Sequence, residues 1–179
     1  MDIFEAIAKR QSYRGGFKDE PVSKEDLKKI VNAGLMAPSG KNAQTTSFVI
    51  VDDQQILADI RKLHKGNKAM QQCQALIACI IDKNPEAIYE GHSFQIEDCA
   101  AAVENMLLAT TTLGYATVWI DGWLRVDERY EKIGEMLGVP KDKIVRVVLP
   151  IGIGNEDYKQ PAKKPFDQRA WFNKYDQKQ

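Results

Sequence analysis

The residues best suited to bind a charged ligand lie near the start of the chain, within residues 9–18. Arg10, Ser12 and Arg14 form an Arg-x-Ser-x-Arg pattern where a predicted helix ends and a loop begins. Two guanidinium groups and a hydroxyl within one short reach can give a phosphate several charge-assisted hydrogen bonds. The alternative is a solvated basic face whose arginines pair with nearby acidic residues, and this segment alone favours that alternative.

Three further segments combine residue types that suit a small ligand. The loop at 37–46 offers hydroxyl, amide and backbone donors, which can hydrogen-bond the edges of a planar heterocycle. A predicted strand ends in Ile120-Asp121-Gly122, where the backbone can come close to a ligand. The pair Lys163-Lys164 can close over a phosphate. Each segment is also compatible with an ordinary role, as a polar connection, a turn or solvated chain.

Several other kinds of site find no support. The sequence GIGN at 152–155 follows a predicted strand, but no helix with a third glycine follows it, which excludes a Rossmann dinucleotide motif. No serine has a G-x-S-x-G context. The histidines and cysteines show neither ligand spacing nor a CxxC pair: His64, His92, Cys73, Cys79 and Cys99. We therefore predict no metal site and nominate no catalytic side chain.

Composition limits the class of protein. The 179 residues suit one domain, or one domain with an appendage, and their mixture is that of a globular protein. Because 25 Lys and Arg balance 25 Asp and Glu, no attraction to nucleic acid or to an anionic membrane follows. The chain begins without a signal-peptide pattern, and its longest apolar run, 75–81, is too short to span a bilayer. With three cysteines interpreted as free buried thiols, we expect a soluble cytoplasmic protein.

The elements that must position these residues alternate between helices and strands. Asp2 with Glu5, Ser23 with Asp26, and Asp127 are predicted helix caps. The alternation predicts an α/β or α+β fold around one sheet, with the run 75–82 as a strand buried on both faces. Helices are expected at 2–11, 23–37, between 53 and 66, at 93–113 and at 127–137; strands are expected at 47–51, 75–82, 116–120 and 144–153.

The last 25 residues differ from the rest. Residues 155–179 have no sustained helical or strand period, yet they carry five aromatic side chains, which a disordered tail rarely does. These residues could pack on the surface of this subunit or of a second one. We divide the chain into a domain at 1–154 and an arm at 155–179, and favour an arm that packs on a partner subunit. The five aromatics are Tyr158, Phe166, Trp171, Phe172 and Tyr175.

Taken in this order, the features resemble the nitroreductase family of flavin-dependent oxidoreductases. The resemblance spans most of the chain, and five pieces in the expected order carry it. They are Arg10-Gln11-Ser12-Tyr13-Arg14; Ala37-Pro38-Ser39-Gly40-Lys41-Asn42-Ala43-Gln44; the strand 47–51; Leu113-Gly114-Tyr115-Ala116-Thr117 leading into Trp119-Ile120-Asp121-Gly122; and Leu149-Pro150-Ile151-Gly152 before a lysine-bearing tail.

The resemblance implies an α+β fold with a central, mostly antiparallel sheet flanked by helices and a C-terminal extended arm. It also implies a homodimer whose interface binds one FMN per subunit. The implied FMN-binding residues are Arg10, Ser12 and Arg14 with Lys163 or Lys164 for the ribityl phosphate; Pro38, Ser39, Gly40 and Asn42 from the partner subunit along the flavin; the Ile120-Asp121-Gly122 backbone near flavin N5; and Gln71 at the isoalloxazine edge.

The resemblance further implies that electrons pass from NAD(P)H through flavin N5 to a nitroaromatic, a quinone or another electron-poor small molecule. One site used in alternation gives ping-pong kinetics, and no acid or base side chain is obligatory. Two alternatives stay open: a flavin-dependent dehalogenase or flavin-fragmenting enzyme on the same fold, and a non-catalytic FMN-binding module.

At three places the sequence departs from the family pattern, which limits how far the family's residue roles apply to this chain. Thr45-Thr46 stands where many members have Pro-Trp, and the tail reads Lys163-Lys164-Pro165, so which lysine meets the phosphate stays open. Residues 83–93 form only a short excursion where relatives often cap the substrate side, which predicts a more open cleft.

Overall fold

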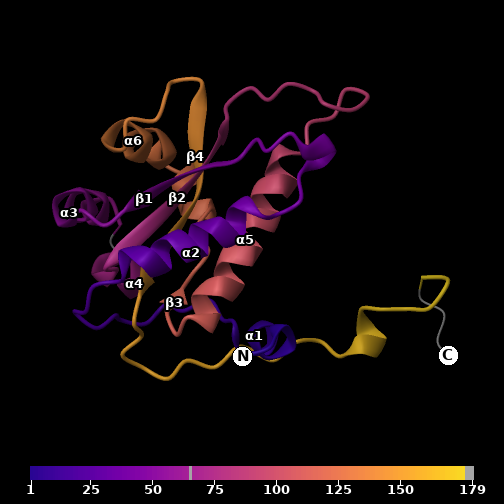
Figure 1. Cartoon of the computed structure of the whole chain (residues 1–179), viewed down its shortest axis with the longest axis horizontal. Helices are drawn as coiled ribbons and strands as arrows, with labels where there is room; N and C mark the ends of the chain where they lie inside the picture. The colour runs from indigo at the N-terminus through magenta and orange to yellow at the C-terminus, as the bar shows by residue number, and fades with distance from the viewer. Residues whose placement is uncertain (65, 176–179) are drawn as a thin grey trace.

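A computed structural model describes residues 1–64 and 66–175. Its centre is a four-stranded sheet in the order β1-β2-β4-β3, in which every neighbouring pair is antiparallel (Figure 1). This arrangement, with helices on both faces, confirms the predicted α+β fold. The strands are β1 (Ser47–Val51), β2 (Ala75–Asp82), β3 (Ala116–Thr117) and β4 (Lys143–Gly152).

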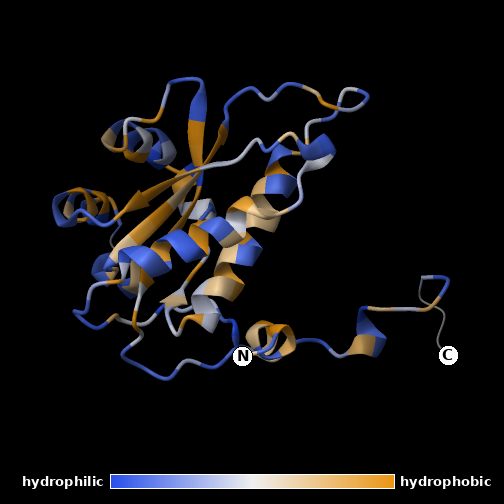
Figure 2. Cartoon of the chain, viewed as in Figure 1, coloured by the Kyte–Doolittle hydropathy of each residue, from blue (hydrophilic) through white to orange (hydrophobic). Residues whose placement is uncertain are grey.

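Strand β2 is buried along almost its whole length, as its continuous apolar run predicts. It lies between β1 and β4, with Ile77 opposite both Ile50 and Leu149. Helices cover both faces of the sheet, so both sets of alternating side chains enter a core (Figure 2). One face packs on α2 (Lys24–Leu35) and α5 (Gln95–Thr112); the other packs on α3 (Gln54–Lys62), α4 (Lys68–Gln72) and α6 (Arg129–Met136).

Four helices begin at side chains that bond their first N–H groups, among them α4, where the Asn67 side chain accepts from the Met70 N–H. Helix α1 (Ile3–Lys9) has the predicted capping box between Asp2 and Glu5. Ser23 accepts a hydrogen bond from the Asp26 N–H at the start of α2, and Asp53 accepts two at the start of α3. Helix α4 and the 3-10 turns η1 (Gly40–Asn42), η2 (Gly122–Arg125) and η3 (Phe166–Gln168) were not predicted, because a hydrophobic period needs a longer segment to be visible.

The predicted strand at 116–120 is wrong in its second half. Regular pairing ends at Thr117, and the chain rejoins β4 only at Ile120, which bonds Val148 in both directions at 3.0 and 3.1 Å. Between these two points, Pro150 of β4 lies opposite Val118, at a position whose N–H would normally donate to the neighbouring strand. Because proline has no N–H, the ladder is interrupted there.

The predicted start of α6 is also wrong. Asp127 does not cap the helix; Glu128 occupies the N-cap position in the left-handed region at φ 56°, with no side-chain cap bond. The turn instead brings the Asp127 carboxylate to the Arg129 guanidinium, 2.5 Å away. Leu137, the last residue of the predicted helix, lies half-buried just after the last helical residue, Met136.

The arm leaves the domain beside α1 and runs away from the body of the molecule (Figure 1). Most of its described residues are exposed. All three cysteines are free and buried, as predicted. Within residues 1–64 and 66–175, no helix combines the length and the apolar character needed to cross a membrane.

Candidate functional site

The two ends of the domain meet in one place, which we call the terminal junction: residues 10–17 with residues 152–160. The Tyr13 N–H donates to the Thr117 carbonyl at 2.9 Å, which places this segment beside the end of β3. The buried Tyr13 hydroxyl donates to the Gly16 carbonyl at 2.5 Å and accepts from the Asn155 N–H at 3.1 Å. One tyrosine thus ties the N-terminal loop to the chain that leaves β4.

Close backbone approach at the terminal junction depends on Gly152. A Cβ atom there would lie 2.7 Å from the Phe17 ring, closer than real contacts allow. Phe17 also pairs with Gly154 across an isolated bridge. The loop therefore lies flat on the last residues of β4 because position 152 has no side chain.

The predicted phosphate-binding arginines lie at the terminal junction. Arg10 is the C-cap residue of α1. Its Nε lies 3.4 Å from the Glu104 carboxylate on α5, so its partner is this distant residue and not Asp19 or Glu20, which are closer in sequence. Arg14 is exposed and donates to the Ser12 carbonyl at 3.3 Å. Because the Glu104 side chain that pairs with Arg10 is itself half exposed, a phosphate can compete for the Arg10 donors.

The arm begins at the same place. The Gln160 side-chain amide donates to the Arg10 carbonyl at 2.5 Å, and the Tyr158 ring contacts the Tyr13 ring edge-on at 5.6 Å. Lys163 and Lys164 follow within four residues of Gln160, and both are exposed. The structure thus places Gln160 beside Arg10, and the assignment of either tail lysine to a phosphate stays a prediction.

The Ile120-Asp121-Gly122 backbone adjoins the terminal junction through β3. The Asp121 carboxylate accepts two hydrogen bonds from Arg125, at 2.8 and 2.9 Å, and one from Arg146 on β4. Burial alone would raise the pKa of Asp121, but the hydrogen bonds and charges of the two arginines outweigh it and hold the pKa below its usual value. A Cβ at Gly122 would meet open space, so a flat ligand can approach this backbone.

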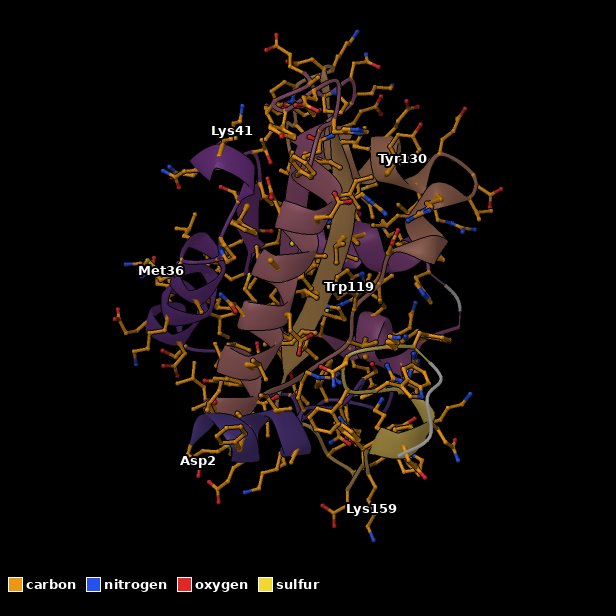
Figure 3. The ribbon with its side chains drawn as sticks, turned by 90° about the vertical axis from the view of Figure 1, so that its right-hand side faces the viewer. Asp2, Met36, Lys41, Trp119, Tyr130 and Lys159 are labelled. Carbon is orange, nitrogen blue, oxygen red and sulfur yellow. The ribbon has the colours of Figure 1, made fainter. Side chains whose placement is uncertain are left out.

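The predicted partner-lining residues lie elsewhere. The loop with Pro38, Ser39, Gly40 and Asn42 is anchored at the start of α5, where the Asp98 carboxylate accepts from the Gly40 N–H at 2.9 Å. Arg10 pairs with Glu104 further along the same helix, and Figure 3 shows Lys41 and Asp2 at opposite ends of α5. Within one chain, the loop 38–42 and the predicted phosphate-binding arginines are therefore not brought together.

Gln71 lies on α4. Its side-chain amide donates to the Arg61 carbonyl at 3.0 Å, between α4 and α3. Its assignment to the edge of a flavin ring stays a prediction.

Two buried polar atoms near the arginines have no hydrogen-bond partner in the described chain. They are Gln11 Oε1, beside Arg10, and the Thr117 hydroxyl, whose own backbone carbonyl accepts from Tyr13. Buried polar groups are nearly always paired, so these atoms indicate a polar ligand. Among the described residues, no group of three His, Cys, Asp or Glu side chains could hold a metal ion.

Sequence reasoning missed Arg125, Arg146 and the role of Tyr13. Arg146 offered a signal, because it is the one charged residue between Ile144 and Ile153 in an apolar strand. Such a position predicts a partner for the charge. Tyr13 offered none, since a tyrosine in a glycine-containing loop indicates neither burial nor a distant partner.

Comparison with known proteins supplies an independent line. The model described as the nitroreductase family matches residues 7–78 and 63–153. A protein of Archaeoglobus fulgidus, provisionally named NADH dehydrogenase/NAD(P)H nitroreductase, is 30% identical over 156 residues, which is 87% of each chain. A Staphylococcus aureus protein named NADPH-dependent oxidoreductase is 27% identical and covers 97% of this chain and 74% of its own. The solved FMN-dependent nitroreductase from Clostridium difficile R20291 has a TM-score of 0.80, at 29% identity and with 96% and 99% coverage.

Proposed function

This chain belongs to the nitroreductase family, and from that premise we propose that it is an FMN-dependent oxidoreductase that passes electrons from NAD(P)H to an electron-poor small molecule. The names of similar proteins supply both halves of this proposal, an NADPH-dependent oxidoreductase and an FMN-dependent nitroreductase. With a quinone as oxidant, the exchange consumes NAD(P)H and one proton and yields NAD(P)⁺ and the quinol. Nitroaromatics are the other expected class of oxidant.

The terminal junction is the observation that carries the proposal. It contains Arg10 to Arg14, and the two other segments that we assign to FMN continue from it: Ile120 to Gly122 follow Thr117, and the tail lysines follow Gln160. The contacts at the terminal junction are Tyr13 to Thr117 and Gln160 to Arg10. We therefore assign the phosphate to the arginines and the flavin ring to the exposed backbone at Gly122.

The chemistry of the donor set fits FMN. Arg10, Arg14 and a tail lysine offer charge-assisted donors to a phosphate, and Ser12 adds a hydroxyl. The unpaired Gln11 oxygen can accept from ribityl hydroxyls, and the unpaired Thr117 hydroxyl can donate to the cofactor. When bound, FMN supplies the N5 atom that accepts hydride and the conjugated ring that returns two electrons.

The residues of this chain contribute binding and orientation. The arginines would hold the phosphate, and the backbone at Asp121 and Gly122 would bind the flavin ring. Because Asp121 is held by Arg125 and Arg146, this backbone keeps its position when charge develops nearby. Since reductant and oxidant would use the same open face in turn, we expect ping-pong kinetics.

The proposal includes a homodimer. Ile3, Phe4 and Ile7 of α1 are exposed, Phe4 by 79%, and the arm exposes Phe166 and Phe172, whose rings contact each other at 6.0 Å. Exposed apolar side chains gathered in this way are typical of an interface. A partner there would also bring the loop 38–42 to the site.

In sedimentation velocity, Phe4→Ser with Phe166→Ser should weaken the dimer, and an unchanged dimer would refute this interface.

The first experiment on function is a visible spectrum of the purified protein, with the released chromophore identified. We expect a yellow protein that releases FMN and is bleached by NADH or NADPH without oxygen. A colourless protein that fails to bind added FMN would contradict the cofactor assignment. Bound flavin that stays oxidised with both nucleotides would favour the non-catalytic module instead.

A further inference from the structure

A cavity of about 370 Å³ lies along the half of β4 that β3 leaves uncovered, between α5 and α6. In Figure 3 the cavity corresponds to the region between Tyr130 and the N-terminal end of α5. Seven of the twelve lining residues are apolar or aromatic: Ile81, Pro85, Ile96, Leu124, Tyr130, Ile144 and Val145. Such side chains suit the apolar part of a small molecule.

The cavity adjoins the backbone that we assign to the reacting edge of the flavin, so the inference rests on the proposed function. Arg125 and Arg146 both line it, and both hydrogen-bond the Asp121 carboxylate. Asp121 does not line the cavity, but both arginines that do are bonded to it, so they connect a molecule in the cavity to the Asp121 backbone. The short excursion at 83–93 contributes only Lys83 and Pro85 to the lining.

The charges around the cavity do not cancel. Lys83 pairs with Glu131 at 2.9 Å, and Asp82 pairs with Lys143, so these two pairs are neutral. The remaining three groups are Arg125, Arg146 and Asp121, in which two guanidinium groups share a single carboxylate. Among these groups, one positive charge is left in excess at the wall of the cavity.

Arg125 is the group best placed to present that charge to a ligand. Its side chain is 60% exposed, whereas that of Arg146 is 15% exposed. Arg125 uses Nε and Nη2 to bind Asp121, so Nη1 is directed away from this carboxylate. A guanidinium held on one edge in this way keeps donors available in a fixed orientation.

We propose that this cavity receives the oxidant and favours flat, electron-poor molecules that carry an anionic substituent, which Arg125 binds while Asp121 and Arg146 hold Arg125 in position. Arg125 is thus a specificity-determining residue, and Arg146 a positioning residue. With a nitroaromatic, reduction to the nitroso compound consumes one NAD(P)H and one proton and releases NAD(P)⁺ and water.

The test compares two acceptors that differ in one charge, 4-nitrobenzenesulfonate and 4-nitrobenzenesulfonamide, with the FMN-loaded enzyme. We expect a lower KM for the sulfonate. Arg125→Gln should raise the KM of the sulfonate about tenfold more than it raises the KM of the sulfonamide, as loss of one charge-assisted hydrogen bond predicts, because any displacement of the Asp121 backbone affects both acceptors alike. Arg125→Lys should retain part of the preference. Lys141→Gln, which removes a nearby charge outside the cavity lining, is the matched control.

A binding measurement that needs no turnover accompanies the kinetics. Benzenesulfonate and benzenesulfonamide are titrated into the oxidised FMN-loaded protein, and the change in flavin absorbance is followed. We expect tighter binding of the sulfonate, weakened about tenfold by Arg125→Gln. If NADH and NADPH both fail to reduce the protein, the proposed function fails, while this titration still tests the cavity.

Two outcomes would overturn the inference. Equal KM and equal binding for the charged and neutral compounds would show that the excess charge does not select the ligand. A rise in KM for NADPH but not NADH in Arg125→Gln, with the sulfonate unaffected, would assign Arg125 to the ribose phosphate of the reductant instead.

Discussion

The centre of the sheet and the terminal junction both join distant parts of the chain, but with different chemistry. In the centre, Ile77 of β2 lies between Ile50 and Leu149, and neighbouring side chains are fully buried and apolar. At the terminal junction, a tyrosine hydroxyl and a glycine make the connection. Apolar packing is strong and fixed, whereas the polar contacts leave unpaired atoms and charges that a ligand can complete.

The largest effect should come from the centre of the sheet. Ile77→Ala should lower the free energy of unfolding by about 2–5 kcal/mol, because it removes fully buried methyl groups and leaves a cavity. The measurement is urea unfolding of the FMN-free protein. Ile50→Ala on the adjacent edge strand is the control, since Ile50 is 37% exposed, and a similar loss in both variants would contradict the distinction.

The next effect should come from the contact between Gly152 and Phe17. Gly152→Ala should lower the free energy of unfolding by about 1–3 kcal/mol, because the new methyl group forces the loop off β4. It should also weaken FMN binding, since the same loop carries the arginines. Gly66→Ala, where a Cβ meets nothing within 4 Å, is the control in urea unfolding and FMN titration. Unchanged FMN affinity would separate the loop from the cofactor site.

A smaller effect, confined to the ligand, should follow from Arg10. Arg10→Ala should weaken FMN binding about tenfold, or about 1.4 kcal/mol, with little loss of stability, because it removes charge-assisted bonds to phosphate. The measurement is the FMN dissociation constant by fluorescence quenching. Lys9→Ala, an exposed neighbour at the end of α1, should leave the constant unchanged. The assignment is wrong if both variants behave alike.

The smallest effect concerns pH. Burial and then the charge of Arg129 lower the pKa of His64 from 6.5, so its neutral form is favoured where it stacks on Trp123 at 4.5 Å. The resulting stability is complete above pH 6.5 and is lost as the pH falls from 6.5 toward the folded-state pKa. Unfolding measured from pH 7.5 to 5 should show this loss in the wild type and less of it in His64→Asn. The exposed His92→Asn is the control, and identical curves for all three would rule out His64.

The sequence was a good guide where one local rule determined the outcome. The apolar run at 75–82 and the cap at Ser23 predicted an element within a few residues. It was a poor guide where the outcome depended on a neighbouring strand. The end of β3 at Thr117 follows from Pro150 on β4, whose missing N–H has no consequence until the two strands are paired.

For the candidate site, the sequence indicated residue types and not their contacts. The Arg-x-Ser-x-Arg pattern made Arg10 a candidate, and the family resemblance linked it to the tail lysines as an expectation. The pairing of Arg10 with Glu104 and the contact with Gln160 required the fold. Arg125 was missed because its importance depends on Asp121 being shared with Arg146.

The terminal junction also sets an order in time. Tyr13 and Asn155 are separated by 142 positions, and at about 5–20 residues per second the ribosome needs about 7–30 s to add that length. During this interval the first arginines have left the ribosome, but the residues that order them have not been made. A chain stalled before position 155 therefore carries the cationic segment without the anchor that shapes it, and the capacity to hold cofactor arises only near the end of synthesis.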